Sequence, residues 1–425
     1  MHITILTLGS RGDVQPFIAL GKGLKQAGHS VKLASQATFE SEIRSHGLDF
    51  ALMSGNPKEG IEGAEGQAML KTKNPIDFVR RMGDLLEPIM ETVLIDSWQA
   101  CQGTDVIIGG GFPFWGFDIA EKLGIPFYYA YLTPGYPTTA FPNAVTPPHL
   151  EKLGSIYNRF SYTLTNLLFW QFFSKPVNQF RQSILNLPPT GIRQNAFTKL
   201  EDAKVEYLIG CSPSITPKPK DWPNRVHLTG YWFLDAPDDF IPPADLVEFL
   251  KAGSPPVYIG FGSMGGEEAQ KIAEIALAAL VKTQQRGIFL SGWSGAKNLD
   301  LPDTIFQIDN IPHSWLFPQM ACIVHHGGAG TTAANFRAGV PGVIIPFFGD
   351  QQFWAYQAAK LGVSPTTINR KNLTVDTLAQ AITNAVENQS MREKAAILGK
   401  KIRSENGVKQ VVEILNSRNL VIGNG

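Results

Sequence analysis

Residues 2–35 read HITILTLGSRGDVQPFIALGKGLKQAGHSVKLAS, and this stretch indicates the fold class. An apolar strand pattern comes first. It is followed by a glycine-containing turn, a helix pattern at about 14–27 that Gly28 closes, and a second strand pattern that begins near Ser30. A strand, a helix and a strand in close succession predict a βαβ unit with a right-handed crossover, and hence a parallel sheet.

The same alternation continues along the chain. Strand patterns follow at 105–110, 126–132 and 206–212, and a helix pattern begins near Asn74 with Pro75 in its first position. The alternation restarts in the second half, with strands at 255–263, 287–292 and 321–328, and helices at 267–282, 350–361 and most of 374–417. This order predicts two doubly wound α/β domains.

Residues 231–244 separate the two halves. They read YWFLDAPDDFIPPA, with three prolines, three aspartates and no sustained period, which is typical of a linker. We therefore predict an N-terminal domain at 1–234, a linker at 235–243 and a C-terminal domain at 244–425. Two such domains are expected to face each other across a ligand crevice at the carboxyl ends of their strands.

The composition excludes several classes of protein. Lys and Arg number 37 and Asp and Glu number 37, so the balanced charge argues against a nucleic-acid partner. Charged residues make up 17% of the chain, against about 25% in typical domains. Three scattered cysteines offer neither a disulfide framework nor a C-x-x-C metal site. Without a signal peptide or a membrane-spanning run, we expect a cytoplasmic protein, either free or peripherally attached to a membrane.

Residues 325–332 read HHGGAGTT and join a buried-type strand to a helix that we expect to start near Thr331. Glycine backbone, two hydroxyl groups and a helix N-terminus converge there, which predicts a binding site for an anion such as phosphate. A tight turn without a ligand is the alternative. The lack of a following Lys-Ser/Thr pair excludes a Walker A loop.

Residues 260–265 spell G-x-G-x-x-G, which resembles a dinucleotide fingerprint. That fingerprint expects an acidic residue about 20 positions later, but the next strand ends in Ser291, Gly292 and Trp293. An NAD-type oxidoreductase is therefore disfavoured. We interpret the turn as a close approach to the phosphate of another nucleotide with Ser263 as a hydroxyl donor, or as glycines needed for packing alone.

Three further polar residues stand at the ends of predicted strands. Asp350 and Gln351 follow the strand VIIPFF and could bind the hydroxyl groups of a sugar, although a helix N-cap role for Asp350 is the alternative. Asp13 follows the first strand at the start of a helix. It could be a general base, or simply a favourable charge at a helix N-terminus.

Three segments together resemble the family 1 glycosyltransferases. They are GSRGDVQPFIALGKGL at 9–24, VYIGFGSM at 257–264 and IPHSWLFPQMACIVHHGGAGTTAANFRAGVPGVIIPFFGDQQFW at 311–354. The resemblance is to the branch that contains sterol 3-beta-glucosyltransferases and antibiotic glycosyltransferases. It implies the GT-B architecture, with two Rossmann-like domains of which the first binds the acceptor and the second binds a nucleotide sugar. It also implies an inverting transfer of the sugar.

The resemblance assigns roles to particular residues. It implies a diphosphate contact for Ser263, His326, Gly328, Ala329, Gly330, Thr331 and Thr332. It implies sugar binding by Asp350 and Gln351. Asp13, in a turn with Ser10 and Gly12, occupies the position of the catalytic base.

The binding of the nucleotide base is less defined. Plant members carry a Trp that stacks on uracil, whereas this chain has residues 310–313 there, so His313 is the matching contact and Trp293 is a candidate for stacking. The acidic ribose ligand of plant members corresponds to Ala334 or a neighbour. UDP and dTDP both remain open as the nucleotide.

No D-x-D motif occurs in the chain, so no carboxylate pair is in place to hold a metal on a diphosphate. We therefore expect no metal and no cofactor, with UDP-glucose as a co-substrate. The expected acceptor is a hydrophobic molecule, most simply a sterol or sterol-like lipid. The alternatives are a carotenoid, a macrolide or another secondary metabolite, or a noncatalytic module that binds a nucleotide sugar.

Residues 155–181 read SIYNRFSYTLTNLLFWQFFSKPVNQFR, with eight aromatic residues and no acidic one. Arg159, Lys175 and Arg181 supply three positive charges. One interpretation is an apolar lip that rests on an anionic membrane surface. The other is an ordinary buried pair of helices, and lining an acceptor cavity is compatible with either.

Overall fold

The computed structural model describes residues 1–422 except 56–62, 64, 65, 67, 70, 71, 73, 74, 238, 262–266 and 291–300. The chain folds into two compact units. The first comprises Met1–Asn143, His149–Leu234 and Asn406–Gly425, and the second comprises Ala144–Pro148 and Asp235–Glu405. None of the helices in the described ranges is both long enough and apolar enough to cross a membrane.

The first unit is built on a parallel sheet of seven strands in the order β3-β2-β1-β4-β5-β6-β7. The strands are β1 (His2–Thr7), β2 (Ser30–Ser35), β3 (Asp49–Leu52), β4 (Val106–Gly110), β5 (Phe127–Tyr131), β6 (Glu206–Ile209) and β7 (Val226–Leu228). The predicted βαβ unit at the N-terminus is confirmed, because β1 pairs in parallel with β2, with Ile5 opposite Leu33. The order reverses between β1 and β4, which marks a topological switch point.

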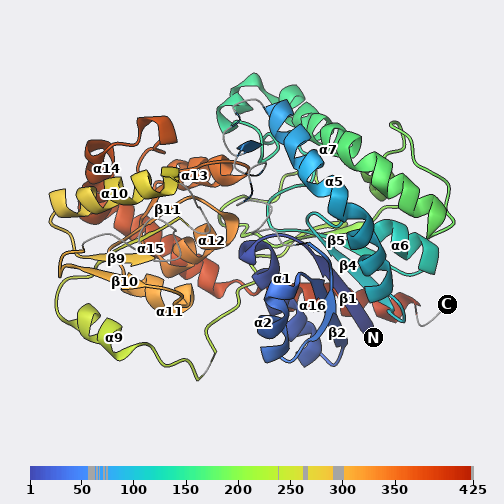
Figure 1. The fold of residues 1–425 in the computed structure, drawn as a ribbon, viewed down its shortest axis with the longest axis horizontal. Coiled ribbons are helices and arrows are strands. Elements are labelled where there is room, and N and C mark those ends of the chain that lie inside the picture. The colour runs from blue at the N-terminus through green and yellow to red at the C-terminus, as the bar shows by residue number, and fades with distance from the viewer. Residues whose placement is uncertain are drawn as a thin grey trace. The chain divides into compact units, whose positions relative to one another are not determined.

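Helices cover both faces of this sheet (Figure 1). They are α1 (Arg11–Gln26), α2 (Glu40–Ser45), α5 (Pro75–Ala100), α6 (Gly116–Leu123), α7 (Ser155–Ser183), α8 (Ala196–Asp202) and α16 (Gly407–Ile422). Helix α1 begins at Arg11, three residues before the predicted start. The local cause is Asp13, whose carboxylate accepts a hydrogen bond from the Ser10 N–H and so stabilises an earlier first turn.

The C-terminal helix α16 packs on α1 and belongs to the first unit. Val411 and Leu415 of α16 are fully buried with Phe17 and Leu24 of α1 in one hydrophobic cluster. The prediction that all of 244–425 forms the second domain is therefore wrong from Asn406 onward. The apolar face of α16 looks like that of any surface helix, and the sequence pattern does not say which sheet it covers.

The second unit repeats the same strand order on a parallel sheet of five strands, β10-β9-β8-β11-β12. The strands are β8 (Val257–Gly260), β9 (Gly287–Leu290), β10 (Ile305–Ile308), β11 (Cys322–His325) and β12 (Gly342–Ile344). The helices are α9 (Ala244–Lys251), α10 (Glu267–Lys282), α11 (His313–Leu316), α12 (Ala329–Ala338), α13 (Gln351–Lys360), α14 (Val375–Glu387) and α15 (Gln389–Ser404). Short 3-10 segments are η1 (Ala37–Phe39), η2 (Pro148–Leu153), η4 (Phe317–Gln319) and η5 (Arg370–Asn372).

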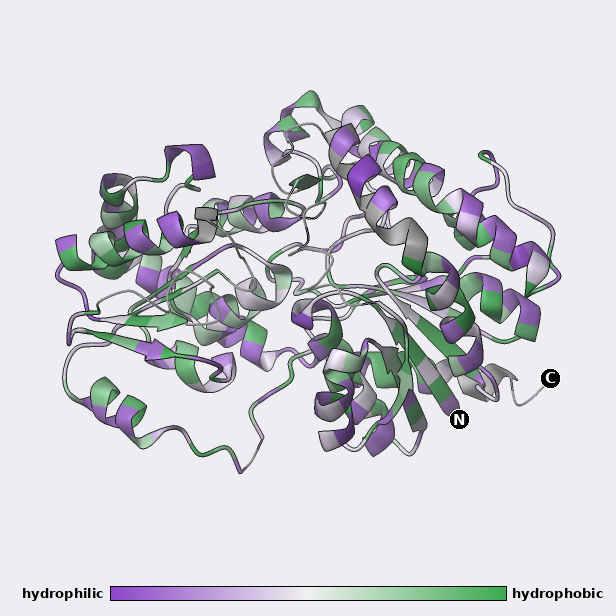
Figure 2. Cartoon of the chain, viewed as in Figure 1, coloured by the Kyte–Doolittle hydropathy of each residue, from purple (hydrophilic) through white to green (hydrophobic). Residues whose placement is uncertain are grey.

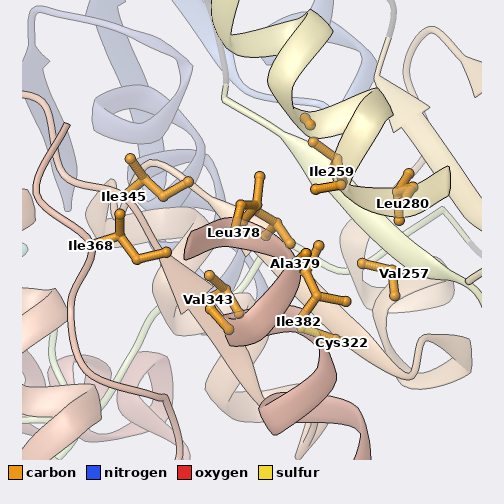
Figure 3. Close-up of a cluster of buried hydrophobic side chains, with 14 of the residues drawn as sticks. Val257, Ile259, Leu280, Cys322, Val343, Ile345, Ile368, Leu378, Ala379 and Ile382 are labelled. Carbon is orange, nitrogen blue, oxygen red and sulfur yellow. The ribbon is translucent and has the colours of Figure 1, made fainter. Parts of the chain in front are cut away.

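Both faces of the second sheet are buried, because successive side chains of a strand point to opposite faces. Val257 and Ile259 pack with residues of α10 and α14, such as Leu280 and Leu378 (Figure 3). Tyr258 between them packs on the other face, in the cluster that contains residues of α9 and α11. The prediction of two doubly wound parallel sheets is confirmed.

Burial on both faces keeps charge out of the strands. All five residues of β4, and all four of β8 and β11, are buried. The strands are accordingly dominated by hydrophobic residues, and hydrophilic residues gather on the helices and loops (Figure 2). This explains part of the low charged fraction of the chain.

Candidate active site

In the second unit, the turn between β11 and α12 has an uncapped helix N-terminus. Helix α12 begins at Ala329 with Gly328 as its N-cap, two residues before the predicted start, and Gly328 has no side chain to cap the helix. The first N–H groups of a helix have no partner within it, and the helix dipole adds positive potential there. Because β11 pairs with β8 so that His325 lies opposite Gly260, the turn also stands at the switch point of the sheet.

His325 holds the conformation of this turn. The Gly327 N–H donates to its Nδ1 (3.1 Å), which assigns the ring proton to Nε2, and Nε2 faces Asn335 Oδ1 at 3.3 Å. The Asn335 side chain in turn donates to the Val340 carbonyl (2.7 Å). Burial lowers the pKa of His325 to about 3, so the ring is neutral at physiological pH. A chain of hydrogen bonds thus ties the turn to the body of α12.

Glycine is required at two positions of the turn. Gly327 has a φ of +91°, and a Cβ there would approach Ile344 Cγ2 to 2.8 Å. A Cβ on Gly328 would come within 2.5 Å of His326 Nε2. A Cβ on Gly327 would also lie 3.1 Å from the backbone oxygen of Gln351. The N-terminus of α13 therefore lies beside the turn.

Two buried polar atoms at this turn, His326 Nδ1 and Thr332 Oγ1, have no hydrogen-bond partner among the described residues. A buried polar atom without a partner costs about 1–3 kcal/mol, and in a native protein it calls for an explanation such as a missing ligand. Burial also lowers the pKa of His326 to about 4, so at neutral pH the ring is uncharged and offers one N–H. The predicted cluster of His326 with residues 328–332 is therefore brought together, and its chemistry suits a bound anion.

Asp350 and Gln351 stand at the start of α13, as predicted. Asp350 is the N-cap residue, but its side chain makes no capping hydrogen bond and instead accepts one from the Trp354 indole (2.8 Å). The buried Gln351 Oε1 accepts from the N–H groups of Phe347 (2.7 Å) and Phe348 (3.2 Å). Both side chains are thus held in place, and the N-cap alternative for the Asp350 side chain is not realised.

The residues predicted to contact a nucleotide base are only partly described. His313 opens the short helix α11 and stacks on Phe317, with 4.1 Å between the ring centroids and an interplanar angle of 16°. Its ring edge also meets Tyr258. Trp293 and Ser263 both lie outside the described residues.

In the first unit, Asp13 is fixed in the first turn of α1, at the carboxyl end of β1. Ser10 donates to Asp13 Oδ2 from both its N–H and its hydroxyl group, each at 2.8 Å. Gly9 has a φ of +143°, and a Cβ there would lie 2.5 Å from the same oxygen. Thr7 donates its hydroxyl to the Asp13 carbonyl (2.8 Å). The helix N-terminal interaction that we considered as the alternative is therefore present.

Desolvation and hydrogen bonding act on the pKa of Asp13 in opposite directions. The residue is exposed, yet the protein atoms around its carboxyl group raise the pKa of Asp13 above its usual value by desolvation, and the hydrogen bonds from Ser10 oppose that shift. A raised pKa makes a carboxylate a better proton acceptor. A Cβ on Gly12 would meet Ser10 Oγ at 3.7 Å, an ordinary contact distance, and Arg11 forms an ion pair with Glu42 (3.3 Å).

Sequence reasoning missed the residues that position the others. His325 and Asn335 hold the glycine turn, and Trp354 holds Asp350. One sequence signal was available: a histidine inside an otherwise apolar buried strand needs polar partners. Asn335 and Trp354 carry no such signal, because each looks like an ordinary residue of an amphipathic helix.

Comparison with known families gives matches at both ends of the chain. Residues 3–142 match the model described as glycosyltransferase family 28 N-terminal domain. Residues 288–417 match the model described as erythromycin biosynthesis protein CIII-like, C-terminal domain. The second match includes the whole glycine turn, α12 and α13.

Curated relatives are similar along nearly the whole chain. A sterol 3-beta-glucosyltransferase of Sclerotinia sclerotiorum is 38% identical over 97% of this chain and 29% of its own length. One of Candida albicans is 38% identical over 99% of this chain and 28% of its own length. The chain thus spans less than a third of the length of these relatives.

Solved structures share the fold at low sequence identity. The glycosyltransferase VinC, crystallised in complex with dTDP, superposes with a TM-score of 0.69 at 17% identity over 100% of both chains. The calicheamicin glycosyltransferase CalG4 gives a TM-score of 0.66 at 16% identity, covering 98% of this chain and 97% of its own.

The two buried histidines predict a pH-dependent stability. Their folded pKa values, about 3 and about 4, lie below the ordinary 6.5, so between these limits the unfolded chain binds more protons. The free energy of unfolding of the second unit should therefore fall as pH is lowered from 7 towards 4, by up to about 1.4 kcal/mol per pH unit for each histidine.

Urea unfolding at pH 7 and pH 5 measures this effect. The variant carrying His325→Gln and His326→Gln should lose less stability between the two pH values than the wild type. His149→Gln, a change at an exposed histidine of the first unit, serves as the control and should behave like the wild type. An unchanged pH dependence in the double variant would contradict neutral burial of both rings.

Proposed function

Because the chain belongs to the glycosyltransferases of GT-B fold, in the group that contains sterol 3-beta-glucosyltransferases and antibiotic glycosyltransferases, we propose that it transfers a hexose from a nucleotide diphosphate to a hydrophobic acceptor. The observation that supports this proposal is a pair of buried polar atoms, His326 Nδ1 and Thr332 Oγ1, that have no partner within the described part of the chain and lie at an uncapped helix N-terminus. The first unit is the acceptor half and the second the donor half.

The acceptor class follows from the relatives. Those named sterol 3-beta-glucosyltransferases are similar over almost the whole chain, which favours a sterol or sterol-like lipid as the acceptor and UDP-glucose as the donor. A carotenoid, a macrolide or another secondary metabolite is the alternative acceptor. A noncatalytic module that binds a nucleotide sugar is the alternative of a different class.

The donor diphosphate is proposed to bind at the glycine turn. The N–H groups of Ala329, Gly330 and Thr331 belong to the first turn of α12 and suit phosphate oxygens. The neutral His326 ring donates its one N–H, and Thr332 contributes a hydroxyl. Ser263 is proposed as a further donor from the second glycine turn. These dipoles stabilise the negative charge that develops on the departing diphosphate.

The sugar and the base of the donor are proposed to contact other residues of the second unit. Asp350 and Gln351 bind sugar hydroxyls, and their fixed orientation favours one arrangement of the ring. A carboxylate can accept several hydrogen bonds, including those from sugar hydroxyls. His313 and Trp293 are the proposed contacts of the base, with UDP as the proposed nucleotide and dTDP as the alternative.

Asp13 is the proposed catalytic base. The acceptor hydroxyl oxygen forms a bond to the anomeric carbon while the bond from that carbon to the diphosphate oxygen breaks on the opposite face, which inverts the configuration. The hydroxyl proton passes to the Asp13 carboxylate. Ser10 positions that carboxylate through two hydrogen bonds. The raised pKa of Asp13 makes the carboxylate a better proton acceptor.

The place of action is proposed from the acceptor. A sterol-like molecule resides in membranes, so we propose a cytoplasmic enzyme with peripheral membrane contact through residues 155–181. That stretch combines exposed apolar side chains with basic residues, as surface-bound helices do.

A product assay tests the function directly. The purified chain is incubated with UDP-glucose and a panel of sterols, carotenoids, macrolides and flavonoids, and the products are analysed by mass spectrometry. We expect a hexose increment on a sterol. A hexose increment found only on another class of compound would change the assigned acceptor. If no compound gains a hexose while the chain still binds UDP, the noncatalytic module would be favoured.

Asp13→Asn should lower turnover by about 10²–10⁴-fold, since general base catalysis contributes about that much. UDP affinity should persist, because Asp13 is not among the proposed donor contacts.

Wild-type turnover should also decline as pH falls through the raised pKa of Asp13, since only the ionised carboxylate accepts a proton. Steady-state kinetics with calorimetric UDP binding measures both effects. Asp202→Asn, at an exposed position of α8, is the matched control, and near-normal turnover of Asp13→Asn would remove Asp13 from the mechanism.

Transfer should not depend on a divalent cation. The sequence has no D-x-D motif, and within the described ranges no group of three or more His, Cys, Asp or Glu side chains suits a metal ion. Turnover with EDTA should equal turnover with added Mg²⁺, because helix and side-chain dipoles meet the leaving-group charge. Complete loss of activity in EDTA, restored by Mg²⁺, would refute this part of the mechanism.

A further inference from the structure

The N-terminal half of α7 exposes a row of large apolar side chains. Ile156 is 87% exposed, Phe160 55%, Leu164 44% and Leu167 37%. Their spacing of four, four and three residues puts them on one face of the helix. Leu153, just before the helix, is 63% exposed. An exposed apolar row of this kind marks an interaction site more often than a chance surface.

This row is not the face by which α7 joins the unit. Buried positions of the helix, such as Tyr162, Trp170 and Phe173, alternate with the exposed ones, and α7 packs along α5. The expectation of an ordinary buried pair of helices therefore holds for one face of α7 only. The exposed face carries a shallow groove of about 320 Å³, lined by Thr139, Ser155, Ile156, Arg159, Phe160 and Thr163.

Two basic side chains stand beside the row, next to the half-buried Glu151. Lys152 and Arg159 are exposed beside Leu153, Ile156 and Phe160, and α7 contains no acidic residue. Arg181, which the sequence suggested as a third surface charge, is instead 1% exposed and forms ion pairs with Asp118 and Glu121. Of the other two basic residues of α7, Arg159 is exposed beside the apolar row and Lys175 is exposed in the C-terminal half of the helix.

We propose that this face, formed by Leu153, Ile156, Phe160 and Leu164 with Lys152 and Arg159, docks on an anionic lipid bilayer. The apolar side chains enter the interface between headgroups and acyl chains, and the two basic side chains pair with anionic headgroups. A second copy of the chain is a poorer occupant. Two copies related by a two-fold axis would bring the same positive charges together in one interface.

The inference deepens the membrane contact of the proposed function and narrows it to the start of α7. A bilayer is also where a sterol-like acceptor would be found. The docking itself does not require catalysis, so vesicle binding and sugar transfer can succeed or fail independently.

Vesicle flotation with the full chain tests the proposal. Vesicles of phosphatidylcholine with phosphatidylglycerol should carry the protein upward in the gradient, and vesicles of phosphatidylcholine alone should carry far less. Added salt should weaken the binding, because screening reduces attraction to a charged surface. No flotation with anionic vesicles at low salt would overturn the proposal.

Variants locate the contact. Arg159→Gln should weaken binding about fivefold, as expected for one basic contact with an anionic surface. Ile156→Glu and Phe160→Glu should weaken it by more than about tenfold, since each removes an apolar anchor and adds a negative charge. Ile192→Glu is the matched control, because Ile192 is 75% exposed in the same unit but lies outside α7. Equal binding by Ile156→Glu and Ile192→Glu would overturn the assignment to α7.

Two further readouts distinguish docking on lipid from misfolding and from self-association. Circular dichroism and UDP binding should be unchanged in all four variants, which shows that they fold. If the face instead joins two copies, light scattering will show a dimer that Phe160→Glu dissociates, and the protein will not float, which would refute docking on lipid. If sugar transfer fails while flotation succeeds, the proposed acceptor is wrong and the docking face stands.

Discussion

The hydrogen bond from the Gly327 N–H to His325 Nδ1 is the constraint on which the second unit's site depends. It can form only if the ring is neutral, and burial of His325 in β11 ensures that. The bond holds the backbone in a conformation that glycine alone adopts readily, and it leaves the N-terminus of α12 open. His326 Nδ1 and Thr332 Oγ1, which have no hydrogen-bond partner in the part of the chain that the structure describes, thereby lie near this open N-terminus.

In the first unit, hydrogen bonds at a turn similarly hold a side chain, but that side chain is a carboxylate. Ser10 directs both of its donors to one oxygen of Asp13, and Gly9 leaves the space that this carboxylate needs. In each unit the candidate site follows a strand beside the switch point of its sheet, so the carboxylate of Asp13 and the glycine turn arise from the same topology. What differs is the side chain that fixes the turn, a hydroxyl in one unit and a neutral imidazole in the other.

The balanced net charge fits this arrangement. In the proposed mechanism, backbone dipoles and one uncharged histidine bind the diphosphate, so no basic surplus is needed. Sparse charge follows in part from strands buried on both faces. Four exposed large apolar residues of the described chain form the row on α7, and the others are scattered over both units. The buried ion pair of Arg181 with Asp118 shows that a charge in the sequence need not be a charge on the surface.

Local patterns in the sequence were sufficient for the alternating strands and helices, both parallel sheets, the glycine turn and the carboxylate at the start of α1. Each of these depends on residues that are near neighbours in the chain. The placement of α16 on the first sheet, the support of His325 by Asn335 and of Asp350 by Trp354, and the exposed face of α7 emerged from packing. An amphipathic helix shows how much of its surface is apolar, but which sheet or solvent that surface meets depends on long-range contacts that no local period encodes.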